Sequence, residues 1–168
     1  MIAGMDSSTA AGLPDHQLAM TVLMTPDTAN FAGNVHGGTI LKLLDQVAYA
    51  CASRYAGRYV VTLSVDQVTF RQPVHVGELV HFLASVNHTG TSSMVVGVKV
   101  VAEDIRARSV RHVNSCYFTM VALGDDGRPA AVPALVPRNA EEQRRYEVAE
   151  ARRAMRREME ERFGDGDG

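Results

Sequence analysis

Two neighbouring glycines and a carboxylate make the segment 34–45 the part of this 168-residue chain best suited to chemistry. Gly37 and Gly38 stand directly before an apolar run, and Asp45 lies seven residues after Gly38. Glycine lets a ligand approach the backbone closely, and the first N–H groups of a helix have no partner within that helix. These N–H groups and the helix dipole can therefore hold an oxygen atom that gains negative charge during a reaction.

Asp45 is the second reactive group of this segment. A carboxylate on an apolar helix is costly to bury without a partner, which favours a catalytic role. An architectural alternative is that Asp45 accepts hydrogen bonds from Tyr49 or from a strand. Asn34 has a side chain that can orient a carbonyl group or a water molecule, although asparagine is also common at helix caps and in loops. We take Asp45, Asn34, Gly37 and Gly38 as the candidate catalytic residues.

Helix geometry separates these groups within one chain. The seven residues from Gly38 to Asp45 span two helical turns, or roughly 10 Å at about 1.5 Å per residue. A carbonyl group polarised at the helix start is therefore awkward for Asp45 of the same chain to reach. Two such helices running antiparallel across a two-fold axis would place Asp45 of one chain near the glycines of the other. The spacing predicts a homodimer with composite sites.

The apolar run from Ile40 to Ala52 predicts the helix that carries Asp45, because its length and its Leu and Ala content favour a helix over a strand. Apolar residues cover well over half of its circumference, where a surface helix would show one stripe. We therefore expect other structure to wrap around this helix. The polar exceptions fall along one narrow side: Lys42, Asp45, Gln46, Tyr49 and Ser53.

Segments rich in Val and aromatic residues dominate the rest of the chain. A short first strand is expected at 17–24, and four long strand-like runs follow at 59–70, 78–88, 93–103 and 110–123. Short connections between consecutive strands favour antiparallel pairing. A curved antiparallel β-sheet wrapped around one long central α-helix is the economical arrangement. The sequence therefore predicts an α+β protein of the hotdog fold.

The C-terminal region differs from the preceding segments in its high content of charged residues. Residues 139–163 hold seven acidic and seven basic side chains, as in a solvated helix lying on its own or a neighbouring subunit, although the arginines at 152–157 could instead meet a phosphate. A thin apolar line runs along it: Val148, Ala151, Met155, Met159 and Phe163. We expect a flexible leader at 1–14, the hotdog domain at 15–138, this charged helix at 139–163 and a disordered tail at 164–168.

Composition argues against several classes of function. A net charge of −2 is not that of a nucleic-acid or anionic-membrane binder. No basic residue precedes Lys42 and no apolar run is long enough to span a bilayer, so we expect a cytoplasmic protein without a targeting segment. Cys51 and Cys116 are expected as reduced core residues. His75, His81, His88 and His112 are scattered along the strand-rich part of the chain, so no metal site is expected.

Several short motifs, in their order, resemble those of the hotdog-fold acyl-CoA thioesterases, and most closely the YciA-type and cytosolic long-chain acyl-CoA hydrolase branch. The signature is the segment PDTANFAGNVHGGTILKLLD at residues 26–45, and the likeness extends over about residues 17–138. Supporting pieces follow in the same order: SVDQVTF at 64–70, VGE at 76–78, TGTSSM at 89–94 and FTMVAL at 118–123.

The resemblance implies hydrolysis of an acyl-CoA thioester to a free carboxylic acid and CoA. In that family an asparagine at the position of Asn34 and an acid at the position of Asp45 act together across a subunit interface. The dimers commonly assemble further as trimers of dimers, so a hexamer is implied. No cofactor is implied, because CoA is part of the substrate and of the product. The implied partners are the acyl-CoA substrate and further copies of this chain.

On this interpretation the thioester carbonyl accepts hydrogen bonds from N–H groups around Gly37 and Gly38. Asp45 of the opposite chain either activates water as a general base or attacks directly to give an anhydride. The phosphates of CoA need cations, and its remaining parts need a polar surface groove. Weaker candidates for substrate contact are therefore His36, Thr39, Arg71, Thr91, Ser92 and Ser93.

Two other functions share the fold. A hotdog hydratase usually pairs its acid with a histidine in a different loop motif, which this sequence lacks. A catalytically silent acyl-CoA-binding sensor normally carries a DNA-binding module, and the balanced charge of residues 139–163 does not supply one. The non-catalytic sensor is kept as the alternative function.

Overall fold

The computed structural model describes residues 13–164. In this part of the chain the elements follow one another as β1 (Gln17–Leu23), the short 3-10 helix η1 (Pro26–Thr28), α1 (Gly37–Ala56), β2 (Val60–Val65), β3 (Leu79–Thr89), β4 (Ser93–Asp104), β5 (Ser109–Ala122) and α2 (Ala140–Phe163). The predicted leader and tail lie almost entirely outside the described residues.

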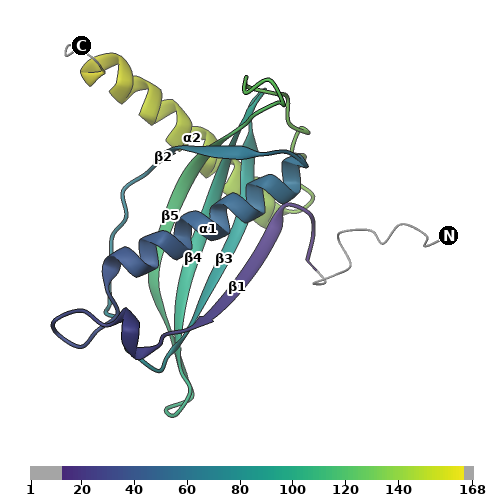
Figure 1. Cartoon of the computed structure of the whole chain (residues 1–168). Coiled ribbons are helices and arrows are strands. Elements are labelled where there is room, and N and C mark those ends of the chain that lie inside the picture. The colour runs from purple at the N-terminus through teal and green to yellow at the C-terminus, as the bar shows by residue number, and fades with distance from the viewer. Residues whose placement is uncertain (1–12, 165–168) are drawn as a thin grey trace.

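The strands form one antiparallel sheet in the order β1-β3-β4-β5-β2 (Figure 1). β3 pairs with β4, and β4 pairs with β5. Because these partners follow one another along the chain, short turns are enough to join them. The expected α+β architecture, with one long helix against an antiparallel sheet, is confirmed. The first long strand is shorter than predicted, because β2 ends at Val65 and residues 66–78 form a connection to β3.

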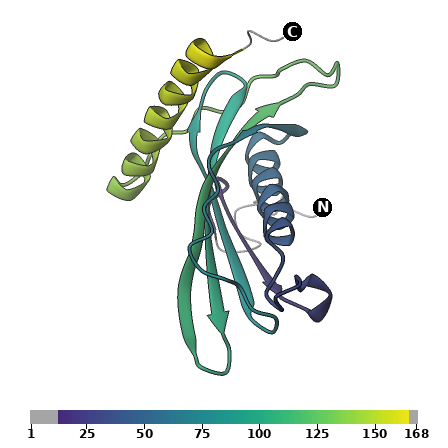
Figure 2. The same ribbon diagram turned by 90° about the vertical axis from the view of Figure 1, so that its left-hand side faces the viewer.

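The sheet lies between the two helices, with α1 against one face and α2 against the other (Figure 2). The main core fills the space between α1 and the sheet. Leu44, Val47 and Ala48 of α1 have no exposed surface there. They belong to one apolar cluster with side chains from the strands: Val80, Phe82, Val96, Val100, Phe118 and Met120.

Local chemistry sets both ends of α1. His36 is the N-cap residue, and its Nδ1 accepts a hydrogen bond from the N–H of Gly38 at 3.1 Å. The helix ends at Gly57, which has the left-handed φ of 62° that glycine adopts without strain. Its N–H donates to the carbonyl of Ser53 and so closes the last turn.

In the single chain, the sheet that wraps around α1 covers only part of the helix surface. A five-stranded sheet covers one side of the helix, and the opposite side is exposed to solvent. Four of the five polar positions predicted for one narrow side lie there, together with an apolar one, whereas Ser53 is half-buried and donates to the carbonyl of Arg58. The exposed side carries Leu41, Lys42, Asp45, Gln46 and Tyr49.

The C-terminal helix forms as predicted, and the C-terminal part of its apolar line is exposed, whereas Val148 is half-buried. Met155, Met159 and Phe163 are 63%, 61% and 81% exposed. The sheet-facing side instead carries arginines, together with the fully buried Ala149. Arg156 donates to the hydroxyl groups of Ser64, at 2.8 Å, and Thr119. The guanidinium group of Arg152 lies 4.0 Å from the ring centre of Tyr117.

None of the helices within residues 13–164 combines the length and apolar composition needed to cross a bilayer.

Candidate active site

The start of α1 presents two glycine N–H groups, and His36 already occupies one of them. The N–H of Gly38 donates to the ring of His36, whereas the N–H of Gly37 has no partner within residues 13–164. A side chain built on Gly37 would contact the ring of Phe70 at 3.7 Å, so Phe70 lies beside the helix start. Gly37 is therefore the better placed of the two predicted glycines to bind an oxygen atom. Thr39 is half-buried in the same turn.

Asp45 lies in the middle of α1, on its exposed side. Its Oδ1 accepts a hydrogen bond of 2.8 Å from the hydroxyl group of Thr62 in β2. This contact fits the architectural alternative of a strand partner, and Thr62 rather than Tyr49 provides it. Because the contact uses Oδ1 and the side chain is exposed, Oδ2 stays accessible to a ligand. Sequence reasoning did not single out Thr62, since threonine is common in strands.

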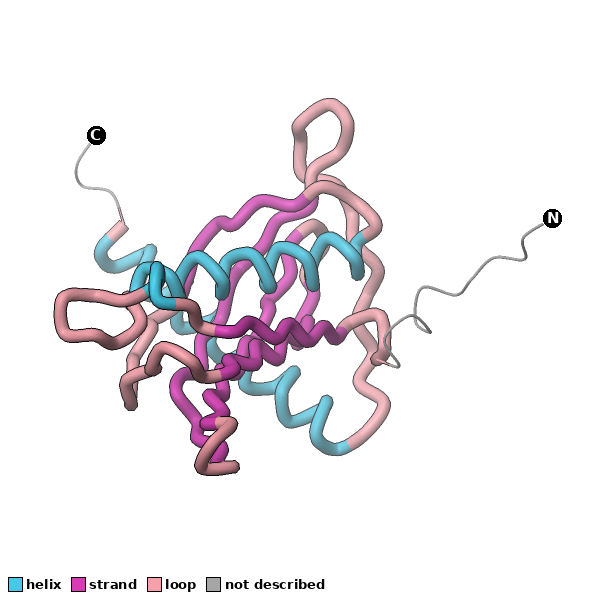
Figure 3. The backbone as a smooth tube through the Cα atoms, turned by 60° about the horizontal axis from the view of Figure 1, so that its bottom comes forward, coloured by secondary structure: helices cyan, strands magenta, loops and turns pink. Residues whose placement is uncertain are grey.

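The loop before α1 closes on Asn30, a residue that sequence reasoning also missed. Its Oδ1 accepts hydrogen bonds from the N–H groups of Ala32, at 2.9 Å, and Asn34, at 3.1 Å. Its backbone N–H donates to the carbonyl of Asn34 at 2.6 Å. The amide Nδ2 of Asn30 makes no hydrogen bond to any residue from 13 to 164 and is free to meet a ligand. This loop projects from the molecule where α1 begins (Figure 3).

Asn34 itself contributes mainly through its backbone. It forms an isolated antiparallel bridge with His75, in the connection between β2 and β3. The neighbouring N–H of Val35 donates to the carbonyl of Val74 at 2.8 Å. The structure therefore places Asn34 in a two-stranded contact that anchors the loop.

The remaining predicted contact residues divide into two places. Arg71 is exposed and follows Phe70, near the start of α1. The turn of Thr91, Ser92 and Ser93 follows the far end of β3, an eleven-residue strand whose near end adjoins the active-site loop. An extended strand of that length spans roughly 37 Å. Within one chain, this turn is therefore far from the loop before α1. It lies nearer to Thr62, because Met94, the residue after the turn, pairs with Met120, and Met120 pairs with Thr62.

Neither cysteine is suited to nucleophilic chemistry. Cys51 and Cys116 are both buried, and burial raises the pKa of each thiol to about 12. A thiol with so high a pKa holds almost no reactive thiolate at neutral pH. Within residues 13–164, no group of three or more histidine, cysteine or acidic side chains is arranged to hold a metal ion.

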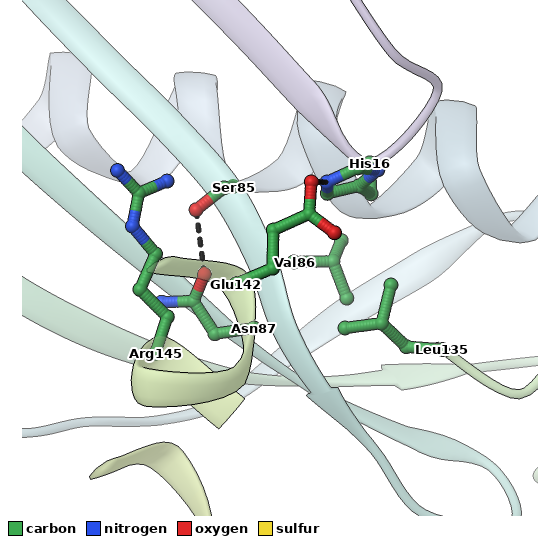
Figure 4. A pocket seen from close by; sticks show the side chains of 7 residues that line it. All are labelled: His16, Ser85, Val86, Asn87, Leu135, Glu142 and Arg145. Atoms are coloured by element: carbon green, nitrogen blue, oxygen red, sulfur yellow. Dashed lines mark hydrogen bonds and ion pairs between the residues drawn. The ribbon is translucent and has the colours of Figure 1, made fainter. Parts of the chain in front are cut away.

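Two cavities lie on the other side of the sheet, against α2. The small one is lined by His16, Asn87 and Glu142 among others (Figure 4). There the hydroxyl group of Ser85 donates to Asn87, and His16 lies 3.3 Å from Glu142. A larger groove of about 470 Å³ lies between the first turns of α2 and the strands. Because the sheet separates both from Asp45, we do not assign them to the candidate site.

Comparison with known proteins places this geometry in a family. A model of the thioesterase superfamily matches residues 32–108. A hexameric acyl-CoA thioesterase of known structure is 33% identical, with a TM-score of 0.83 over 86% of this chain and 92% of that one. The acyl-CoA hydrolase of Staphylococcus aureus, solved with butyryl-CoA and CoA, is 31% identical, with a TM-score of 0.78 over 89% of this chain and 93% of that one.

Relatives found by sequence similarity support the same family. The chain is 51% identical over 140 residues to protein VdlD of Helicobacter pylori, covering 83% of this chain and 80% of that protein. It is 33% identical to the cytosolic acyl coenzyme A thioester hydrolase of the rat, covering 81% of this chain and 36% of that longer protein. The fold and site thus define a member of the thioesterase superfamily. Within it, the chain belongs to the hotdog-fold acyl-CoA thioesterases and is a thioester hydrolase.

Structures of three alanine variants of the Staphylococcus aureus hydrolase mark positions probed in that protein. One variant replaces an asparagine, a second an aspartate fifteen positions further on, and a third a threonine seventeen positions beyond the aspartate.

Proposed function

We propose that this protein hydrolyses acyl-CoA to a free carboxylic acid and CoA, in a site that two protomers complete together. The observation that carries the proposal is Asp45, a carboxylate on the exposed face of α1, held through one oxygen by Thr62. A carboxylate so held can take a proton from water while its orientation stays fixed.

Residue spacing supports the assignment of Thr62 and favours Asn30 over Asn34 as the amide group. Asn30 lies fifteen positions before Asp45, and Thr62 lies seventeen positions after it. These are the intervals between the three positions varied in the Staphylococcus aureus hydrolase. Asn34 is only eleven positions from Asp45 and does not fit the series. The free Nδ2 of Asn30 agrees with a role as hydrogen-bond donor.

The exposed face of α1 supports a composite site. Asp45 lies eight residues beyond Gly37 along the helix, which corresponds to roughly 12 Å. Leu41 and Tyr49 are exposed on the same face, and β2 leaves Leu63 62% exposed at the sheet edge. Exposed Leu41, Tyr49 and Leu63 among the polar side chains of this face favour a covering partner. A second copy with its α1 antiparallel would cover it and bring its Asp45 to the Gly37 end.

The reaction then follows from these groups. The thioester carbonyl accepts hydrogen bonds from the N–H of Gly37 and from Nδ2 of Asn30. Oδ2 of the partner's Asp45 takes a proton from a water molecule, whose oxygen attacks the carbonyl carbon. The resulting oxyanion is stabilised by the same two donors. When it collapses, the carbon–sulfur bond breaks, CoA leaves as a thiolate that gains a proton, and the carboxylic acid is released.

The substrate and the assembly are parts of the same proposal. Butyryl-CoA and CoA bind to the Staphylococcus aureus hydrolase, and we assign acyl-CoA as the ligand here. CoA belongs to the substrate, so the proposed steps need no additional cofactor. Arg71, close to the helix start, is the proposed contact for a phosphate of CoA. Similarity to a hexameric acyl-CoA thioesterase supports a trimer of dimers.

Release of CoA from a panel of short, medium and long acyl-CoA substrates tests the proposal. Asp45→Asn removes the base and keeps the hydrogen bond from Thr62, so kcat should fall by about 10²–10⁴-fold. Asp126→Asn is the matched control, because Asp126 is an exposed carboxylate in the turn after β5, where it accepts from the N–H of Arg128. Wild-type turnover by Asp45→Asn would refute the assignment of the base.

A further inference from the structure

We propose that Glu78 and Arg111 form a positioning pair for the active site, acting through the segment 73–75 on the loop that carries Asn30. The inference rests on the proposed function, because it takes Asn30 to be a group that contacts the thioester. Neither residue reaches the reacting atoms in this account. Their role is to hold the backbone that presents the Nδ2 of Asn30.

The pair itself is short and doubly bonded, with a buried carboxylate and a partly buried guanidinium group. Glu78 is 5% exposed, and Arg111 donates to both of its carboxylate oxygens at 2.6 Å. Burial alone would raise the pKa of Glu78, but the hydrogen bonds from Arg111 and from the N–H of His75, with the charge of Arg111, lower it to about 2. The carboxylate is therefore ionised throughout the range in which enzymes of this kind operate.

The same two side chains also form hydrogen bonds with the connection between β2 and β3. Nη2 of Arg111 donates to the carbonyl of Pro73 at 2.7 Å. The backbone N–H of His75 donates to Glu78 at 2.8 Å. Pro73 and His75 are thus fixed on either side of Val74 by groups that come from β5 and from the residue before β3.

Segment 73–75 is in turn hydrogen-bonded to the loop before α1, which carries Asn30 and Asn34. The carbonyl of Val74 accepts from the N–H of Val35, and His75 pairs with Asn34 in an antiparallel bridge. Asn34 then exchanges two hydrogen bonds with Asn30, one through the backbone carbonyl and one through its N–H. A continuous series of hydrogen bonds therefore leads from the ion pair to Asn30.

A positioning role explains why a charged pair stands here instead of an apolar contact. A buried ion pair adds little net stability compared with apolar residues of the same volume. The planar guanidinium group, however, can bind a carboxylate and a carbonyl at the same time in a fixed geometry. Lysine would keep the charge but could not reproduce this fork. The positioning role of Arg111 thus depends on the planar, forked shape of its guanidinium group.

Arg111→Lys is the test variant, measured by kcat, KM and thermal unfolding on the full-length oligomer. We expect kcat to fall by about tenfold to a hundredfold, as for a displaced catalytic group, with KM changed less than about twofold. Glu78→Gln is the second variant: its one amide oxygen can replace Oε2 as the acceptor for Arg111 and His75, and only the acceptor at Oε1 is lost, so kcat should fall less than for Arg111→Lys. Glu103→Gln is the control, because Glu103 binds His81 at 2.7 Å on the neighbouring strand and should leave kcat unchanged.

A double-mutant cycle distinguishes positioning from general stabilisation. In an Asn30→Asp background, Arg111→Lys should cause no further loss of kcat, because the group that it positions has already been replaced. Independent, multiplying losses would overturn the inference, as would a wild-type kcat or a change in KM alone for Arg111→Lys. If Asn30→Asp itself keeps wild-type kcat, the role of Asn30 in the proposed function fails, and the inference fails with it.

Discussion

At the scale of single residues, the hydrogen bond between Asp45 and Thr62 defines what the carboxylate can do. It fixes one oxygen at 2.8 Å from a hydroxyl group of the neighbouring strand and leaves the other accessible. Asp45 is exposed in the single protomer, so the cost of removing a carboxylate from water arises only when a partner or a substrate covers it. The local fold is thus compatible with a charged group at this place.

The two candidate asparagines can be separated by one conservative change at each. Asn30→Asp keeps the Oδ1 that accepts from Ala32 and Asn34, so the loop should remain closed, but it removes the amide donor. Loss of one donor to an oxyanion costs about 10²–10³-fold in kcat. We expect that loss for Asn30→Asp and at least a tenfold smaller one for Asn34→Asp. Steady-state kinetics on one good acyl-CoA would check it, and the reverse order would return the role to Asn34.

Some site residues could be predicted from the sequence and others could not, for physical reasons. Asp45 stood out because a carboxylate within an apolar helical run is energetically unusual. Gly37 and Gly38 stood out because paired glycines at a helix start expose N–H groups. Asn30 did not, because an asparagine in a polar loop is common for turn formation alone. Thr62 shows its role only when β2 and α1 are placed side by side.

At the scale of elements, the connection from β2 to β3 is the segment that joins the sheet to the site. The N–H of Asp66 donates to Tyr117, and that of Arg71 donates to Val113, so the connection follows β5 after β2 has ended. The amide of Asn114 donates to the carbonyl of Thr69 at 3.0 Å. Because of these contacts, Phe70 lies beside the start of α1. The sequence pattern of 59–70 predicted a strand that continues to residue 70. Residues 66–70 instead follow β5 through single hydrogen bonds and do not form a ladder, so β2 is shorter than predicted.

Glu78 should make the stability of this region depend on pH. Its pKa is lowered from an ordinary value of 4.5 to about 2, so its stabilising contribution is complete above pH 4.5 and is lost as the pH falls towards 2. Glu78→Gln should destabilise the protein by about 1.5–3 kcal/mol at pH 7, as for hydrogen bonds to a charged group. Urea denaturation from pH 7 down to pH 2 should show this difference shrinking below pH 4.5. A difference independent of pH would contradict the account.

The contact face of α2 illustrates what hydrophobic periodicity misses. The helix was predicted from its charge pairs, and pairs such as Arg162 and Glu158 do form, at 2.7 Å. Its contact with the sheet, however, includes arginines, whose guanidinium groups bind hydroxyl groups and lie over an aromatic ring, together with Tyr146 against His88 and the buried Ala149. Arginine combines an apolar stem with a polar head, so a polar residue can form the buried side of a helix.

At the scale of the whole molecule, exposed apolar side chains within residues 13–164 include those of two surfaces on opposite sides of the sheet. One is the α1 and β2 face, with Leu41, Tyr49 and Leu63; the other is the line of Met155, Met159 and Phe163 on α2. The sheet separates the first surface from α2 (Figure 2). The expected wrapping of α1 is completed, in the proposed function, by a second copy. The central claim is therefore that one active site draws residues from two chains.

Complementation between two inactive variants tests that claim most directly. Asp45→Asn and Asn30→Asp chains would be purified separately, mixed under dissociating conditions and reassembled, with CoA release as the readout. In a composite site each mixed dimer has one intact site and one doubly altered site, so random pairing should restore about a quarter of wild-type activity. Asp45→Asn mixed with the double variant Asn30→Asp/Asp45→Asn is the control and should restore none. A first mixture that is no more active than the mean of its two parents would show that each chain carries its own site.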